Sequence, residues 1–403
     1  MTDQFAGWVA KGLGRAVLYL KTHDSKACRA ALLHACTHNL IYDRQCEESR
    51  TPYLLELIEL TGETESYRNG ILAALKSEDD DVDQGQMFEL AASFAEKGDS
   101  EIKQSMYSAF GRTGFGLTAA DELVRLDGLA GLLFVARSFG SEDAEERPWQ
   151  FRHLLETLEK YHGKQTLPAE LENFWRELRE YEELCERERQ KGPEPRPDYE
   201  TVKHSLPRFA WAWARNASIQ ELEMAADDLL AETDQERLVG YLRMFRERPF
   251  PRAIDRLLEL ARSEDDRIAV GSLVALSKIQ DARVRALGLG LMTEAGGCGY
   301  AVDLLTHNSR DGDYHIIECL LEKRIEPDEY HRLGQGVRTF VEAHRSEEAE
   351  RPLLLLYENG PCSLCRHGAI EELISINRFP DWMREECQYD AYSETRKLVK
   401  SPA

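Results

Sequence analysis

The sequence contains no hydrophobic run of the length that a membrane-spanning helix needs. Its longest apolar stretches, such as Leu129 to Ala136, fall far short of the roughly 20 residues that cross a bilayer as a helix. The opening residues, Met1 to Ala10, also lack the basic segment with which a secretory signal begins. We therefore expect a cytoplasmic protein without a membrane partner.

The sequence also lacks an excess of positive charge. The 51 Lys and Arg residues are outnumbered by 73 Asp and Glu residues, which gives a formal net charge of -22 at pH 7. Such an excess of negative charge disfavours nonspecific binding to nucleic acid or to an anionic membrane. Nucleic acid is therefore a disfavoured partner, and any contact with it requires a local cluster of basic residues.

Regularly spaced cysteines are also absent. The nine cysteines are scattered over 403 residues without a repeated spacing. In a chain that lacks a secretory signal, this distribution favours reduced thiols over a framework of disulfides. We expect most of these cysteines to be small core residues.

The sequence shows no convincing run in which apolar and polar residues alternate with the period of a half-buried strand. Almost every segment instead repeats its apolar residues with a period near 3.6, which predicts an all-α protein. In the N-terminal part we expect helices over residues 4–21, 25–40, 52–60, 65–76, 84–97, 100–110 and 119–138. Short polar or glycine-containing joints separate them, so consecutive helices are expected to pack antiparallel.

Changes in composition divide the chain into three predicted segments. Residues 1–140 form an N-terminal helical array, and residues 141–206 form a charged helical spacer. Near the end of the spacer, the sequence KGPEPRP at Lys191 to Pro197 is incompatible with a continuous helix and is typical of a linker. Residues 207–403 form a C-terminal array of short helices.

Three apolar positions recur in phase with a period of 30 residues in this C-terminal array. They are Ile254, Val284 and Tyr314, then Leu257, Leu287 and Ile317, and finally Ala261, Leu291 and Leu321. A fixed period of this length is expected when each unit is a helix pair that can bury its apolar face only against neighbouring pairs.

The stretch EDDRIAVGSLVALSKIQDARVRALGLGL resembles the short HEAT-like repeat of about 30 residues. In that repeat an aspartate opens a helix, Val and Arg follow, and an Ala-Leu pair closes it. The matching residues are Asp281, Arg283, Val284, Ala286 and Leu287, and likewise Asp266, Arg267, Ala275 and Leu276. The resemblance covers Pro251 to Lys323 and then fades, because the next in-phase positions are the polar residues His344, Glu347 and Arg351.

The resemblance implies an α-solenoid of antiparallel helix pairs, a HEAT-like superhelix. It further implies a non-enzymatic scaffold or adaptor that binds a protein partner along the repeats, because the repeat consensus is a packing pattern and carries no chemistry.

The strongest local departure from the acidic composition lies at the start of the C-terminal array. Between Arg237 and Arg262 there are seven arginines and three acidic residues, and LPRFAWAWARNAS lies just upstream. Aromatic rings and guanidinium groups together form protein hot spots and can equally stack on bases. The candidate partner-binding residues are Arg208, Trp211, Trp213, Arg243, Arg246 and Arg248.

Three interpretations of this stretch stay open. A purely structural role, in which the rings fill a junction and the arginines pair with acids, is favoured over an acidic or phosphorylated protein partner. That partner is in turn favoured over nucleic acid, which a HEAT-like glycosylase would bind. A modification or lyase-type enzyme that holds a protein substrate on its repeats is a further alternative, with Cys298 as its hypothetical nucleophile.

Two groups of residues carry donors that can bind metals. PCSLCRH offers Cys362, Cys365 and His367, with Cys387 farther along the chain, but it lacks a second cysteine pair at zinc-finger distance. A helix start with packed cysteines is the favoured interpretation there.

The second group is His34 and His38, spaced four residues apart on one helical face. No glutamate follows His34 as a metalloprotease helix requires, so boundary histidines are favoured. The acidic stretch Glu78 to Gly85 likewise lacks the glutamate that closes a calcium loop. We therefore predict no cofactor and no catalytic residue.

Overall fold

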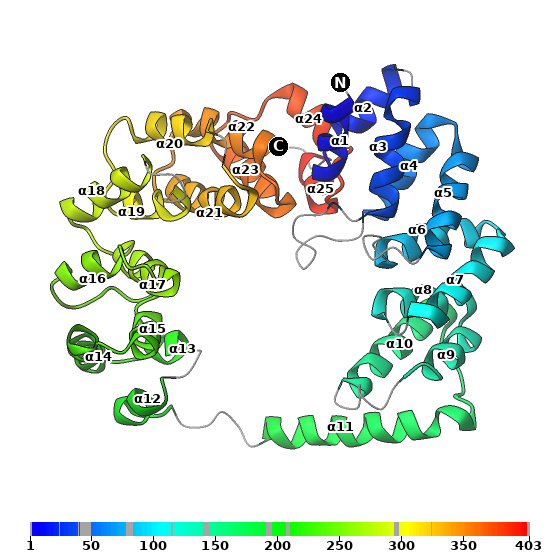
Figure 1. Cartoon of the computed structure of the whole chain (residues 1–403), viewed down its shortest axis with the longest axis horizontal. Coiled ribbons are helices and arrows are strands. Elements are labelled where there is room, and N and C mark those ends of the chain that lie inside the picture. Colours follow the sequence, from blue (N-terminus) through cyan, green and yellow to red (C-terminus); the bar gives the residue numbers. More distant parts are fainter. Residues whose placement is uncertain are drawn as a thin grey trace. The chain divides into compact units, whose positions relative to one another are not determined.

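The computed structural model describes residues 2–400 apart from 24, 39, 41–49, 78–83, 114–115, 140–145, 191–195, 207–209, 294–297 and 324 (Figure 1). Within these residues the chain is all-helical and has no strand, which confirms the predicted fold class at this level. None of the described helices is both long enough and apolar enough to cross a membrane.

The chain divides into two compact units. The first comprises residues 1–194 together with 382–403, and the second comprises residues 195–381. The boundary lies in the predicted linker, of which residues 191–195 fall outside the described part. The division into three segments stays a prediction.

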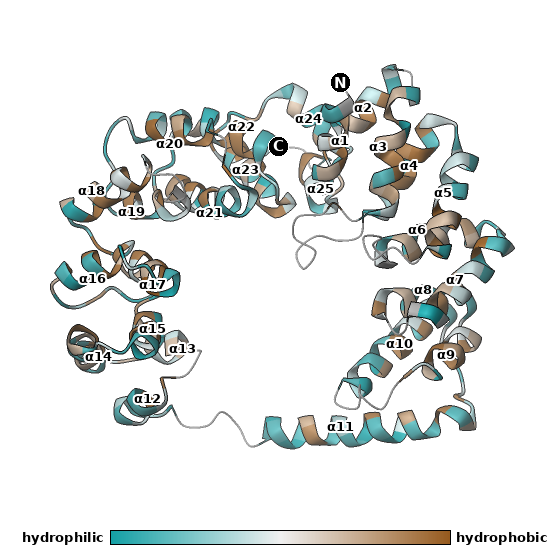
Figure 2. Ribbon diagram, in the orientation of Figure 1, coloured by the Kyte–Doolittle hydropathy of each residue, from teal (hydrophilic) through white to brown (hydrophobic). Residues whose placement is uncertain are grey.

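The first unit contains thirteen described α-helices. They are α1 (Thr2–Lys11), α2 (Arg15–Thr22), α3 (Arg29–Thr37), α4 (Thr51–Thr61), α5 (Thr64–Lys76), α6 (Gln84–Glu96), α7 (Ser100–Thr113), α8 (Leu117–Asp127), α9 (Leu129–Ala136), α10 (Arg147–His162), α11 (Glu172–Gln190), α24 (Asp381–Cys387) and α25 (Ser393–Lys400). Helix α11 is mostly hydrophilic, as Figure 2 shows, and Leu178 is its buried residue.

Three predicted helices differ from the structure. The helix expected over 4–21 is interrupted at Gly12, whose φ of 72° lies in the left-handed region that ends a helix. The helix expected over 119–138 is split by Gly128, with a φ of 56°, into α8 and α9. The helix expected over 25–40 begins as the 3-10 turn Ser25–Cys28 before α3.

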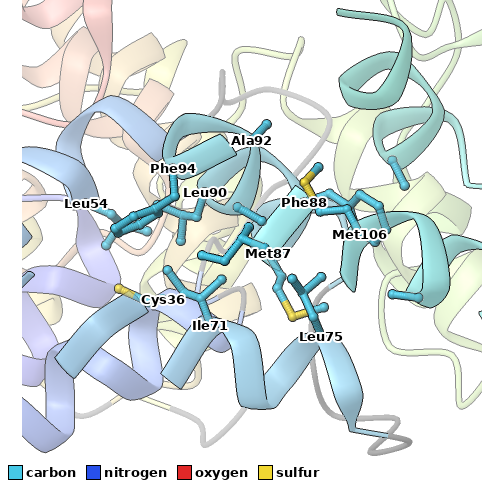
Figure 3. Close-up of a cluster of buried hydrophobic side chains, with 14 of the residues drawn as sticks. Cys36, Leu54, Ile71, Leu75, Met87, Phe88, Leu90, Ala92, Phe94 and Met106 are labelled. Atoms are coloured by element: carbon cyan, nitrogen blue, oxygen red, sulfur yellow. The ribbon is translucent and has the colours of Figure 1, made fainter. Parts of the chain in front are cut away.

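The core of the first unit lies between consecutive and alternate helices. Helix α5 packs against α3, α6 and α7, and α8 packs against α6, α9 and α10. Figure 3 shows Phe88 and Leu90 of α6 among buried residues such as Ile71 and Met106. Each helix thus buries its apolar face only when its neighbours are in place.

The two ends of the chain meet within this first unit. The backbone N–H of Ala391 donates to the carbonyl of Gly12 at 2.8 Å, and Arg15 Nε lies 3.0 Å from Glu386 Oε2. The residues after position 381 therefore complete the core that the N-terminal helices begin.

The second unit is built from twelve described α-helices. They are α12 (Tyr199–Ser205), α13 (Ala210–Arg215), α14 (Ile219–Ala231), α15 (Gln235–Met244), α16 (Asp255–Leu260), α17 (Asp266–Leu276), α18 (Ala282–Leu291), α19 (Asp303–Thr306), α20 (Asp313–Leu321), α21 (Pro327–Ala343), α22 (Glu350–Asn359) and α23 (Ser363–Ser375). From α13 to α23, each odd-numbered helix packs against the next odd-numbered helix.

The positions predicted to recur every 30 residues form the interior of this unit. Of the nine in-phase residues, all but Leu291 are buried. Asp281 caps α18 as expected, because its carboxylate accepts from the backbone N–H of Arg283. For α17 the cap is Asp265, one residue before the expected Asp266, and its carboxylate accepts from the backbone N–H of Arg267. These caps satisfy N–H groups that a helix start otherwise leaves unpaired.

Ion pairs also recur at about the repeat spacing, in both units. In the second unit they include Arg215 with Glu247, Arg267 with Glu236, and Arg283 with Asp255, at sequence separations of 32, 31 and 28 residues. In the first unit, Arg68 pairs with Asp99 and Arg147 with Glu177, at separations of 31 and 30 residues. Side chains about 30 residues apart are therefore spatial neighbours in both units.

Candidate functional site

The two tryptophans of the predicted partner-binding stretch lie on the short helix α13. Trp213 is 7% exposed, and its indole N–H donates to the carbonyl of Pro197 at 2.8 Å while the Arg196 guanidinium covers its ring. Trp211 is half-buried beneath the guanidinium of Arg215, which lies 5.0 Å from the ring centroid. Trp213 therefore has a structural role, and Trp211 offers only part of its ring to a partner.

Most of the seven arginines in the basic stretch are engaged with the protein itself. Arg237 pairs with Glu232, Arg252 with Asp227 and Glu223, and Arg256 with Glu259, while Arg248 and Arg262 donate to backbone carbonyls. Within the described residues, the side chains of Arg243 and Arg246 make neither a hydrogen bond nor an ion pair, and both are exposed. Arg208 falls outside the described residues.

A second group of side chains forms a compact cluster between α21 and α23. His331 of α21 lies beside Cys362 and Cys365 at the start of α23, and their ligand atoms are all within 4.8 Å of one another. His331 Nδ1 is 3.5 Å from Cys365 Sγ. The two cysteines are buried and His331 is half-buried.

The local sequence explains how this cluster forms. Cys362 is the N-cap of α23 and Cys365 lies one turn later, so the two sulfurs fall on one side of the helix start. A hydrogen bond from the Cys365 thiol lowers the pKa of Cys362 to about 6, against the effect of burial. The same hydrogen bond, reinforced by burial, raises the pKa of Cys365.

Neighbouring polar groups hold the imidazole of His331 in place. Gln335 Nε2 lies 2.8 Å from His331 Nε2, and Arg332 Nη1 donates to Gln335 Oε1 at 2.9 Å. Arg332 is itself fixed by Asp303, whose carboxylate lies 2.6 Å from Nη2. Burial raises the pKa of Asp303.

The other donors predicted from sequence are not part of this cluster. His367 Nε2 lies 3.6 Å from Glu371 of its own helix, and Cys387 belongs to the first unit. The rings of His34 and His38 lie 4.0 Å apart, and His38 Nδ1 is 3.1 Å from the carbonyl of His34. The side chain of Cys298 and residues 78–83 of the acidic stretch fall outside the described part of the chain.

His331 was not among the donors predicted from the sequence. It lies 34 residues before Cys365, close to one repeat period. A search for donors one period upstream of the cysteine pair would have found it, because that period brings side chains of adjacent repeats together.

A polar cavity of about 550 Å³ opens between α18 and the residues that follow α19. Two of its lining side chains are engaged within the protein: Arg285 pairs with Asp313, and His344 Nε2 lies 2.7 Å from the carbonyl of Thr306. Such a lining binds and orients polar groups, but it does not by itself define a ligand.

Comparisons of the chain with protein-family models, with curated proteins and with solved structures gave no match. The HEAT-like resemblance therefore depends on this chain alone. At the level that the structure supports, the protein is all-helical and compatible with a helical repeat.

Proposed function

We propose that the protein is a non-enzymatic scaffold built as an α-solenoid, and that it binds a protein partner along its helical repeats. The observation that carries the proposal is the recurrence of contacts at one repeat spacing, both in the buried in-phase positions and in the ion pairs of the second unit. Helices that stack in this way expose an extended row of side chains to a partner.

The proposed contact surface consists of Arg243, Arg246 and the half-buried ring of Trp211. The two arginines are uncommitted in a chain with a net charge of -22, whereas the other arginines of the stretch are used internally. An acidic or phosphorylated surface is complementary to two such groups, because guanidinium binds carboxylate and phosphate with paired hydrogen bonds.

The test is an affinity capture from lysate of the source organism with the full chain, in parallel with and without nuclease. The test variant is Arg243→Glu with Arg246→Glu. A matched control, Arg256→Glu with Arg262→Glu, changes the charge equally at arginines that pair within their own helix or donate to its backbone. Captured proteins are identified, purified and titrated against all three forms.

We expect a nuclease-resistant partner whose affinity falls at least about tenfold in the test variant and stays near native in the control. Equal affinity for all three forms would contradict a role of Arg243 and Arg246 in partner binding. A nuclease-sensitive catch would favour nucleic acid, and its affinity should then fall steeply with added salt.

A further inference from the structure

The cluster of His331, Cys362 and Cys365 is not used by the proposed partner surface, and its geometry points to a metal ion. We propose that these three side chains bind one Zn²⁺ ion, with a fourth coordination position open to water or a solute. The inference is independent of the scaffold function, since it concerns a different set of side chains.

One distance in the cluster matches that of a tetrahedral zinc site. Zinc binds thiolate sulfur at about 2.3 Å and imidazole nitrogen at about 2.0–2.1 Å, so a sulfur and a nitrogen on one tetrahedral ion are about 3.5–3.6 Å apart. The observed separation between Cys365 Sγ and His331 Nδ1 is 3.5 Å. All three ligand atoms lie within 4.8 Å of one another, so small side-chain rotations would bring them to the spacing of ligands on one ion.

The donor types agree with this assignment. Two thiolates and an imidazole form a soft set that selects zinc over magnesium or calcium, and three protein ligands leave one position open. Two thiolates also neutralise the charge of Zn²⁺. Arg338 and Arg366 lie close enough to Cys365 to act on it electrostatically. Their guanidinium groups would therefore face a metal centre without net charge.

The residues around His331 can supply the outer hydrogen bond that a metal-bound histidine usually has. An imidazole that binds through Nδ1 carries its proton on Nε2, where it needs an acceptor. Gln335 Nε2 already lies 2.8 Å from His331 Nε2. Rotation of the amide by about 180° would place Gln335 Oε1 there as the acceptor for the imidazole N–H. Arg332 keeps its ion pair with Asp303 after that rotation.

A disulfide between Cys362 and Cys365 is the competing use of the two thiols. Both cysteines are free thiols in this structure. A disulfide would also involve only the two sulfurs. It would not explain why His331, which comes from a different helix, lies beside them. Metal binding accounts for all three side chains together and would tie α21 to α23.

The experiment uses the full-length, reduced protein. Zinc content is measured after dialysis, and Co²⁺ is titrated as a spectroscopic probe, because a thiolate ligand gives a charge-transfer band that carboxylates and histidines do not. We expect one ion per chain, a rise in the thermal unfolding temperature on Zn²⁺ addition, and protection of two thiols from alkylation.

Variants distinguish the ligands. His331→Asn and Cys362→Ser should each weaken zinc binding at least about 100-fold, more than the loss of an outer-shell group does, and Gln335→Ala about tenfold. His367→Asn and Cys319→Ser are the matched controls. They alter a histidine paired with Glu371 and an exposed cysteine 3.9 Å from His315, and binding should stay native in both.

If Cys362→Ser does not fold, the His331→Asn variant still tests the proposal. His331 is half-buried, so its replacement should be tolerated, and circular dichroism can verify that the variant keeps its helical content. The proposal is overturned if the reduced native protein takes up no metal, or if His331→Asn binds zinc as tightly as native. It is equally overturned if His367→Asn abolishes binding, or if the two cysteines oxidise to a disulfide in the presence of zinc.

Discussion

Arg285 of α18 and Asp313 of α20 form a bidentate ion pair inside the second unit, with Nη1 to Oδ2 at 2.8 Å and Nη2 to Oδ1 at 2.6 Å. Both residues are buried, and 28 positions separate them. The carboxylate also accepts from the backbone N–H of Arg310 at 2.8 Å. The pair thus connects α18 to α20 through two buried charged groups.

Replacing Asp313 by asparagine should destabilise the second unit by roughly 3–5 kcal/mol, because it leaves the guanidinium of Arg285 buried without its counter-charge. Urea unfolding followed by circular dichroism measures the loss. Adding Arg285→Met to the Asp313→Asn variant should recover part of it, since no unpaired buried charge then remains. If the double variant loses the sum of the two single losses, the pair is not coupled as the geometry indicates.

Stability of the first unit should depend on pH through Glu122. Burial raises the pKa of this carboxyl to about 7, even though Arg125 Nη2 lies 2.5 Å from Oε2. The folded chain therefore binds a proton more tightly than the unfolded chain, so the free energy of unfolding falls as pH rises from about 4.5 to 7. A shift of this size corresponds to up to about 3 kcal/mol.

The Glu122→Gln variant should show a shallower fall over that window, as followed by urea unfolding between pH 5 and 8. Glu170→Gln, at an exposed carboxyl of the same unit, serves as the control and should retain the native pH profile. Parallel profiles for native protein and the Glu122 variant would contradict the assignment.

Alanine substitutions at two glycines near the N-terminus should change the free energy of unfolding in opposite directions. A Cβ on Gly14 would lie 1.9 Å from the carbonyl oxygen of Glu386, so Gly14→Ala should cost at least about 1–3 kcal/mol. Gly7 lies inside α1 with nothing near its Cβ position, so Gly7→Ala should stabilise by about 0.5–1 kcal/mol.

Thermal unfolding gives the sign of each effect, and hydrogen exchange locates it. Faster exchange in α24 and α25 is expected only for Gly14→Ala. If both variants shift the unfolding temperature in the same direction, the close approach at Gly14 does not determine stability.

Part of the candidate site could be predicted from the sequence. Trp211, Arg243 and Arg246 were found as a local reversal of charge beside aromatic residues, and the structure leaves the two arginines uncommitted within its described residues. Trp213 could not be assigned in this way. Its burial depends on Pro197, which lies outside the aromatic stretch and accepts the indole N–H.

The sequence by itself determined the helical class, the 30-residue period and the capping Asp281, because these depend on interactions within a turn or on the repeated need to bury one face. It did not determine which donors meet. His331 joins Cys362 and Cys365, and His367 does not, because packing of α21 against α23 selects the neighbours of each side chain. In the same way, tertiary contacts joined Gly12 to Ala391 across almost the whole chain, which no local periodicity encodes.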